Sequence, residues 1–253
     1  MSKIFRKTRL KSLNKRNKFI RYVFYAIGEI VLVVIGILIA LQINTWSERE
    51  KELQQEKVMI ANLHSEFRNN YALLKQVKSK HQQISKSTYL LLSFMGLPES
   101  EIMHHNPDSI LSAAIDVKGF RPPQNAISEI FGSGKLNLIS SDSLKAALFE
   151  WVAAMEEKDD AFETMDQMLQ DMLLPYLAKN ASLKNIDRYG LLNWKESTRL
   201  KSNNLKLYQD TEFENNLDNH AWAVITYLNT LEALEVTSQK IIRLTEPGGV
   251  DGK

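Results

Sequence analysis

Hydrophobic positions in this chain form one unbroken run near the N-terminus and several helix-spaced series after it. The run covers residues 22–43 and reads YVFYAIGEIVLVVIGILIALQI. At about 1.5 Å of rise per residue, a helix of this length crosses roughly 30 Å of hydrocarbon. Tyr22, Tyr25 and Trp46 stand near its ends, where amphipathic rings favour the membrane interface. The run predicts a transmembrane helix, with a buried helix of a soluble protein as the alternative.

After residue 46, apolar residues recur at alternating spacings of three and four, which is typical of amphipathic helices with a coiled-coil seam. The first series predicts a long helix that ends at about Phe94, because Gly96 and Pro98 follow. This helix either begins at a capping box, Ser47 with Glu50, or continues the membrane helix without a break. Three polar residues interrupt its seam: Asn70, His81 and Thr88.

Two short helices are predicted next, followed by a long one. Asn106 and Pro107 form a cap and first turn that predict a helix to about residue 115, and a second short helix covers about 123 to 132 or 134. The clearest seam follows Ser141 and continues to about residue 176, where Pro175 should kink the last turn. Only Lys158 breaks this seam, beside an acidic run, and we expect a hinge or helix break there.

The last part of the chain predicts loops and then one more long helix. Residues 181–210 are polar and weakly periodic, so we expect loops with short helices. Thr211 and Glu214 form a capping box that opens the final helix, which ends before Pro247. No stretch alternates with period two for long enough to predict a strand.

The predicted fold class is therefore all-α: one transmembrane helix followed by an elongated antiparallel helical bundle. Three long amphipathic helices cannot be stable unless their apolar faces are buried on one another or on another chain. We expect four regions: a basic cytoplasmic tail (1–21), the transmembrane helix (22–43), an extracytoplasmic helical domain (44–246) and a flexible tail (247–253).

Charge is distributed unevenly, although the formal net charge is only +2. Residues 1–21 contain nine basic side chains and no acidic one, whereas three basic residues follow the apolar run within about 15 positions. This bias predicts a single-pass membrane protein with a cytoplasmic N-terminus and a C-terminal domain outside the cytoplasmic membrane. The length of the run favours an uncleaved signal anchor over a cleaved signal peptide. A basic block next to an apolar run indicates contact with anionic lipid, and we expect no nucleic-acid partner.

Candidate chemistry is sparse. The chain has no cysteine, which excludes disulfides and thiolate chemistry. His104, His105 and Asp108 could ligate a metal, but they lie in a predicted loop, and the other histidines lack metal-binding spacing. The acidic residues of 156–166 mostly take outward positions of their helix, which indicates a solvated face rather than a calcium site. We expect no metal and no cofactor.

One sequence superficially resembles a nucleotide-binding loop. Residues 131–135 read FGSGK, but Glu129 stands where the first glycine of such a loop belongs and Leu136 where its hydroxyl residue belongs. We interpret the segment as a glycine-terminated helix and turn. Since no other catalytic motif is present, we expect that the protein is not an enzyme.

A stripe in the membrane helix offers one candidate site. Around a helix, Gly36 lies about 20° to one side of Glu29 and Ala40 about 20° to the other. Small residues four apart let helices approach closely, and a polar side chain can bond across such a contact. The stripe predicts transmembrane helix packing. Alternatively, Glu29 extends towards the basic cytoplasmic edge and contributes nothing to association.

Residues 25–44, YAIGEIVLVVIGILIALQIN after a basic tail, resemble the start of a family of uncharacterised single-pass membrane proteins found in Bacteroidota-type bacteria. The likeness extends more weakly to residues 120–139 and 208–246. The resemblance implies a membrane topology and a lineage, but no activity and no catalytic residues.

These features favour a membrane-anchored helical interaction or scaffold module of the cell envelope. Its expected partners are membrane lipid and a protein partner or second copy bound through helix packing. The alternative is a ligand-sensing periplasmic bundle that signals through a separate partner, with a small molecule held near Trp151, Trp194 or Trp222. An enzyme of unrecognised type is the third hypothesis.

Overall fold

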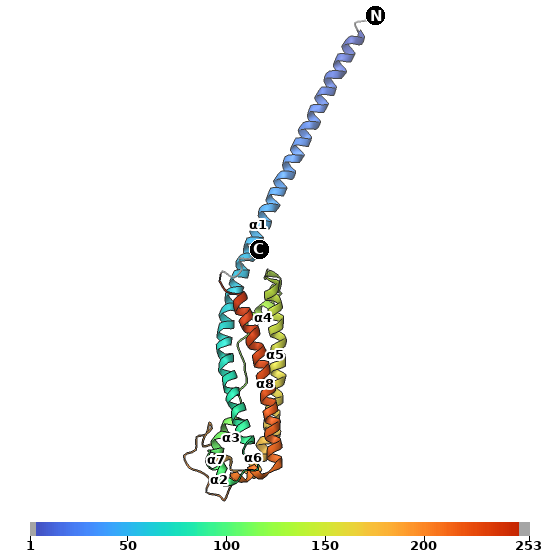
Figure 1. The fold of residues 1–253 in the computed structure, drawn as a ribbon. Helices are drawn as coiled ribbons and strands as arrows, with labels where there is room; N and C mark the ends of the chain where they lie inside the picture. The colour runs from blue at the N-terminus through green and yellow to red at the C-terminus, as the bar shows by residue number, and fades with distance from the viewer. Residues whose placement is uncertain (1–3, 248–253) are drawn as a thin grey trace. The chain divides into compact units, whose positions relative to one another are not determined.

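The computed structural model describes residues 4–247, and it describes side chains from residue 20 onward. These residues form helices and loops without a β-strand, which confirms the all-α prediction (Figure 1). The α-helices are α1 (Ile4–Leu92), α2 (Glu99–Ile102), α3 (Pro107–Ile115), α4 (Asn125–Gly132), α5 (Asp142–Met168), α6 (Leu174–Asn180), α7 (Leu183–Ile186) and α8 (Thr211–Leu244). Two 3₁₀ turns, η1 (Lys135–Leu138) and η3 (Asn204–Gln209), and a π-helical turn, η2 (Leu169–Leu173), complete the described elements. Most of the predicted flexible tail, residues 248–253, lies outside the described residues.

Helix α1 is uninterrupted from Ile4 to Leu92, so the apolar helix continues into the next segment instead of stopping at residue 47. The chain divides into two compact units, and the division falls inside this helix, between Lys57 and Val58. In the first unit, the apolar side chains of residues 20–46 are exposed around the helix. Their length and hydropathy are sufficient to cross a membrane.

The second unit, from Val58, is an elongated bundle of three long helices: the remainder of α1, then α5 and α8 (Figure 1). His64 near the beginning of this part of α1 contacts Thr245 just after α8, with 3.1 Å between Nδ1 and Oγ1. Further along, Lys78 pairs with Glu235, with 2.8 Å between Nζ and Oε2. Helix α8 therefore runs antiparallel to α1.

Helix α5 runs parallel to α1. The rings of Phe67 and Trp151 pack edge to face at a centroid distance of 4.8 Å, and farther along α1 Leu91 shares an apolar cluster with Leu169, which follows α5. Because α8 is antiparallel to α1, it is antiparallel to α5 as well. Two parallel helices require a connection that returns along the bundle, and the segment from α3 to α4 makes this return.

Two apolar clusters form the core of the bundle. One extends along the middle and includes Phe67, Trp151 and Tyr227, and the other closes the end where α1 stops and α8 starts. The second cluster joins Phe94 and Tyr208, which approach edge to face at 5.8 Å. Burial of these aromatic side chains supplies the main driving force that joins the helices.

Most predicted helix ends agree with the structure, and two details do not. The side chains of Asn106 and Ser141 accept capping hydrogen bonds from backbone amides, as expected for residues that open helices. At α8, however, Asp210 is the cap in place of the predicted Thr211, because its side chain accepts from the amide of Glu212. The predicted hinge at Lys158 is also wrong, since α5 continues through it without a break.

Candidate functional site

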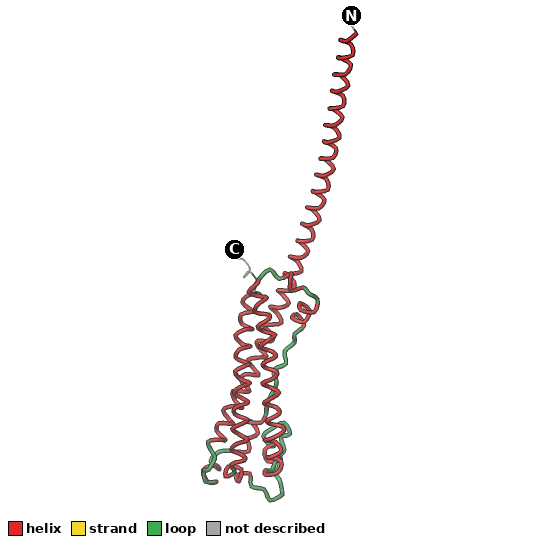
Figure 2. Tube along the Cα trace, turned by 90° about the vertical axis from the view of Figure 1, so that its right-hand side faces the viewer, coloured by secondary structure: helices red, strands yellow, loops and turns green. Residues whose placement is uncertain are grey.

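The returning segment is an extended strap, residues 116–124, which has no regular secondary structure. Figure 2 shows a loop running lengthwise along the helices at this place. An extended chain cannot satisfy its own amides and carbonyls, so buried parts of it need partners from elsewhere. The surrounding helices provide those partners through polar side chains that point into the bundle.

Phe120 is the most completely buried residue of the strap, and both its backbone amide and its carbonyl are hydrogen-bonded to side chains. Its amide donates to the hydroxyl oxygen of Tyr227 on α8 at 2.8 Å. Its carbonyl accepts from Nζ of Lys158 on α5 at 2.9 Å. The Lys158 side chain is only 2% exposed and also pairs with Asp159, which reaches solvent. Lys158, the polar residue that interrupts the α5 seam, thus holds the strap by donating a hydrogen bond to it.

Helix α1 holds the strap at two further points. Nε2 of His81 lies 2.8 Å from the Lys118 carbonyl oxygen and 3.3 Å from its amide nitrogen. The shorter contact is satisfied when Nε2 carries the proton and donates to the carbonyl. About three turns towards the apolar segment, Nδ2 of Asn70 donates to the Pro123 carbonyl at 2.8 Å. The predicted seam interruption at Thr88 has another role, because its hydroxyl donates to Ile84 in its own helix.

The histidine of α8 completes this set at the start of the strap. Nε2 of His220 bonds the carbonyl oxygen of Ala114 at 2.9 Å, at the end of α3. His81 and His220 are both almost fully buried, and the Nδ1 atom of each has no hydrogen-bond partner among the described residues. Burial is the main cause that lowers the pKa of both imidazoles, because it disfavours the charged form. Both rings are therefore neutral near pH 7.

Aromatic rings fill the space around the bonded strap. The ring of Tyr227 lies 4.7 Å from that of His81 and 5.3 Å from that of Phe162. A side-chain carbon placed on Gly119 would come within 3.2 Å of the Phe162 ring, so the strap passes close to α5. Burial also raises the pKa of Tyr227 to about 12, so its hydroxyl remains protonated and accepts the Phe120 amide with a lone pair.

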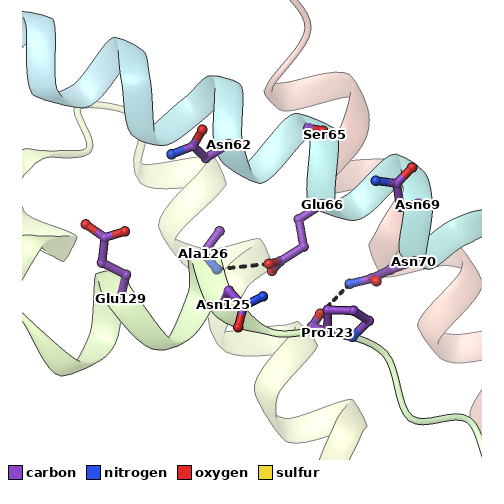
Figure 3. A pocket seen from close by; sticks show the side chains of 9 residues that line it. All are labelled: Asn62, Ser65, Glu66, Asn69, Asn70, Pro123, Asn125, Ala126 and Glu129. Atoms are coloured by element: carbon purple, nitrogen blue, oxygen red, sulfur yellow. Dashed lines mark hydrogen bonds between the residues drawn. The ribbon is translucent and has the colours of Figure 1, made fainter.

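At the end of the strap, the entry to α4 borders a polar hollow of about 360 Å³ (Figure 3). Helix α4 has no cap of its own, and Oε2 of Glu66 accepts from the amide of Ala126 at 2.9 Å instead. The remaining oxygens, Oε1 of Glu66 and Oδ1 of Asn70, are buried without a hydrogen-bond partner among the described residues. Carboxylate, amide and hydroxyl groups dominate the lining: Asn62, Ser65, Glu66, Asn69, Asn70, Asn125 and Glu129, with Pro123 and Ala126.

The predicted packing stripe lies in the first unit. Glu29, Gly36 and Ala40 are all exposed there, and a side-chain carbon placed on Gly36 would meet nothing within 4 Å. The stripe is therefore open to another helix or to lipid, and its role in association stays a prediction.

The other candidates have ordinary structural surroundings. His105 packs near the Phe94 ring at 5.0 Å, and Asp108 accepts from the Asn204 amide at 2.8 Å. Within residues 20–247, no group of three or more His, Cys, Asp or Glu side chains is arranged to hold a metal ion. Helix α4 ends at Gly132 and is followed by Gly134 with φ 71°, which agrees with the predicted glycine-terminated helix and turn.

The three tryptophans proposed as ligand contacts are far from equivalent. Trp151 is fully buried against Phe67 in the core, whereas Trp222 and Trp194 are exposed on α8 and on a loop. No local pattern in the sequence indicates that the strap is buried, but several of its hydrogen-bond partners stand out as polar residues in apolar seams. Three of them are polar side chains that interrupt apolar seams, Asn70, His81 and Lys158, and His220 lies in the α8 seam in the same way but bonds the end of α3.

One protein family of known sequence pattern matches part of this chain. Residues 29–153 match the model of DUF6090, a family of unknown function. The match begins within the apolar segment, includes the strap and ends inside α5, and it supports the predicted relation to uncharacterised proteins. No curated protein and no solved structure matches the chain.

Proposed function

We propose that this protein is a non-enzymatic, membrane-anchored helical interaction or scaffold module of the bacterial envelope. The observation that carries the proposal is the continuity of α1. One helix contains both an apolar segment long enough to span a membrane and, from Val58, the first long helix of a folded bundle. A chain of this kind holds a helical surface at a membrane.

The apolar segment supports an anchor in lipid. A helix that is apolar on all sides needs an apolar environment around it, and the second unit provides its own separate core. The nine basic residues of 1–21 favour a cytoplasmic N-terminus, an uncleaved signal anchor and a periplasmic bundle at the inner membrane. Helix packing through Glu29, Gly36 and Ala40 would bind a second copy of the chain or another membrane protein.

The bundle offers exposed apolar side chains for protein contact. Phe149 on α5 and Trp222 and Val236 on α8 are each more than half exposed. Large exposed aromatic residues are enriched at protein interfaces. Confinement to one bilayer raises the effective concentration of a partner, so even a modest contact surface can form a complex.

Site-specific photo-cross-linking in cells tests the interaction role. A benzoyl-phenylalanine is placed at Phe149, Trp222 or Val236, and the matched control is the buried position Trp151. We expect cross-linked protein adducts from at least one surface position and none from Trp151. Failure of every surface position to cross-link any protein would contradict the proposal.

A second candidate, ligand sensing through a separate partner, is favoured by the hollow at the α4 entry. Its buried acceptor oxygens on Glu66 and Asn70 would suit a small molecule that carries hydrogen-bond donors. Ser65→Trp would fill this hollow, and Ser143→Trp on exposed α5 is the control. If sensing is the function, an envelope extract stabilises the wild type and the control against heat, but not Ser65→Trp.

A further inference from the structure

A loop at one end of the bundle exposes a concentration of apolar side chains. This distal loop, residues 187–203, connects α7 to η3 at the end where α1 stops and α8 starts (Figure 1). Leu191 is 99% exposed and Leu200 is 80% exposed. Tyr189, Leu192 and Trp194 are also exposed, and none of these five residues belongs to an apolar cluster of the core.

The base of the distal loop is fixed by side-chain amides. Oδ1 of Asn185 accepts from the amide of Thr198 at 2.8 Å. Oδ1 of Asn204 accepts from the amide of Ser182 at 2.8 Å, and its Nδ2 donates to Asp108 at the same distance. The exposed apolar residues therefore project from a loop whose ends are bonded to the bundle.

Charge distinguishes this end from the rest of the bundle. Residues 179–206 contain seven basic and two acidic side chains, whereas the remaining residues of 58–247 contain 12 basic and 22 acidic ones. Arg199 pairs with Glu196, but Lys184, Lys195 and Lys201 have no carboxylate partner among the described residues. Lys184 lies over the Trp194 ring, 5.9 Å from its centroid.

We propose that the distal loop binds the surface of an anionic lipid bilayer. Leucine, tryptophan and tyrosine side chains that alternate with lysine and arginine suit the boundary between headgroups and acyl chains. The basic side chains attract anionic headgroups, and the apolar ones enter the layer beneath. Lysines also line a hollow of about 610 Å³ beside the loop, at Lys179, Lys201 and Lys206, which extends the basic surface.

A protein partner is a weaker explanation for these residues. The apolar side chains project from a loop, and of the five only Leu200 lines the hollow beside it. Insertion into a headgroup layer needs no matching surface, whereas a protein partner needs one of complementary shape. This contact is separate from the N-terminal anchor and does not depend on the proposed interaction role.

The test uses the full chain in zwitterionic nanodiscs and a single cysteine, which the cysteine-free sequence makes straightforward. Leu191→Cys carries an environment-sensitive nitrobenzoxadiazole dye, and Val236→Cys, exposed on α8, is the matched control. We expect phosphatidylglycerol vesicles to raise and blue-shift the emission at residue 191 only. Because the dye reports its own position, binding by the basic N-terminal tail does not imitate this result.

Charge variants identify the source of the binding. Neutralising Lys195, Arg199 and Lys201 together to Gln should weaken the affinity for anionic vesicles, measured by the dye at residue 191, on the order of 100-fold. Neutralising Lys75, Lys86 and Lys145, which lie elsewhere on the bundle, should leave it unchanged.

Three results would overturn the proposal. The first is an unchanged emission at residue 191 with anionic vesicles. The second is an equal response to phosphatidylcholine vesicles or in the neutralised loop variant, which would remove the role of anionic lipid. The third is a response that depends on protein concentration without vesicles, which would assign the loop to a protein partner.

Discussion

Tyr227→Phe isolates the hydrogen bond at the centre of the strap. The substitution removes one oxygen and keeps the ring that packs beside His81 and Phe162. It leaves the buried amide of Phe120, now bonded at 2.8 Å, without an acceptor. A buried donor without a partner costs about 1–3 kcal/mol. At roughly 2–4 °C per kcal/mol for a domain of this size, the melting temperature should fall by several degrees.

The assay is unfolding of the full chain in nanodiscs, followed by helical circular dichroism. Tyr89→Phe is the matched control, because that hydroxyl is on an exposed side chain and has no hydrogen bond in the structure. We expect the control to change the free energy of unfolding by less than about 0.5 kcal/mol. Amide hydrogen exchange supplies a local measurement, and exchange at Phe120 should accelerate in Tyr227→Phe alone.

Equal effects of Tyr227→Phe and Tyr89→Phe on stability, together with unchanged exchange at Phe120, would contradict this prediction. They would show that the strap is not held by the helices at this point. A loss of stability without faster exchange at Phe120 would assign the effect to packing of the ring instead.

Two further predictions concern pH and the membrane helix. Burial lowers the folded-state pKa of His81 and His220 below 6.5, so the unfolded chain takes up protons first as the pH falls. The free energy of unfolding should be level well above pH 6.5 and decline as the pH falls through 6.5, and His81→Asn with His220→Asn should flatten that decline in urea titrations. In a transmembrane association assay, Gly36→Leu or Ala40→Leu should weaken association and Glu29→Gln should retain much of it. A scrambled apolar helix that associates as well as the wild type would contradict the packing stripe.

The long helices could be predicted from sequence because their signals are local. Apolar spacing, a proline after Asn106 and the serine before α5 each act within a few residues of the helix they define. The cap of α8 was misplaced by one position because Asp210 and Thr211 are both good capping residues, and only the backbone geometry distinguishes them.

The strap could not be predicted because its partners are distant in sequence. Phe120 is bonded by side chains 38 and 107 positions away, and nothing in its own neighbourhood indicates burial. The expected break at Lys158 followed from treating a charged residue in an apolar seam as a defect. In the structure Lys158 can be buried because the backbone carbonyl of Phe120 accepts a hydrogen bond from its ammonium group.

The most direct test of an anchored envelope module is cysteine accessibility in intact cells with a permeabilised outer membrane. Single cysteines are placed at Val236 in the bundle and at Ser12 in the basic tail, and both are exposed to a membrane-impermeant maleimide. We expect that the protein stays in the membrane fraction, that Val236→Cys reacts in intact cells, and that Ser12→Cys reacts only after lysis. Reaction of Ser12→Cys but not Val236→Cys in intact cells, or recovery of the full-length protein in the soluble fraction, would contradict this proposal.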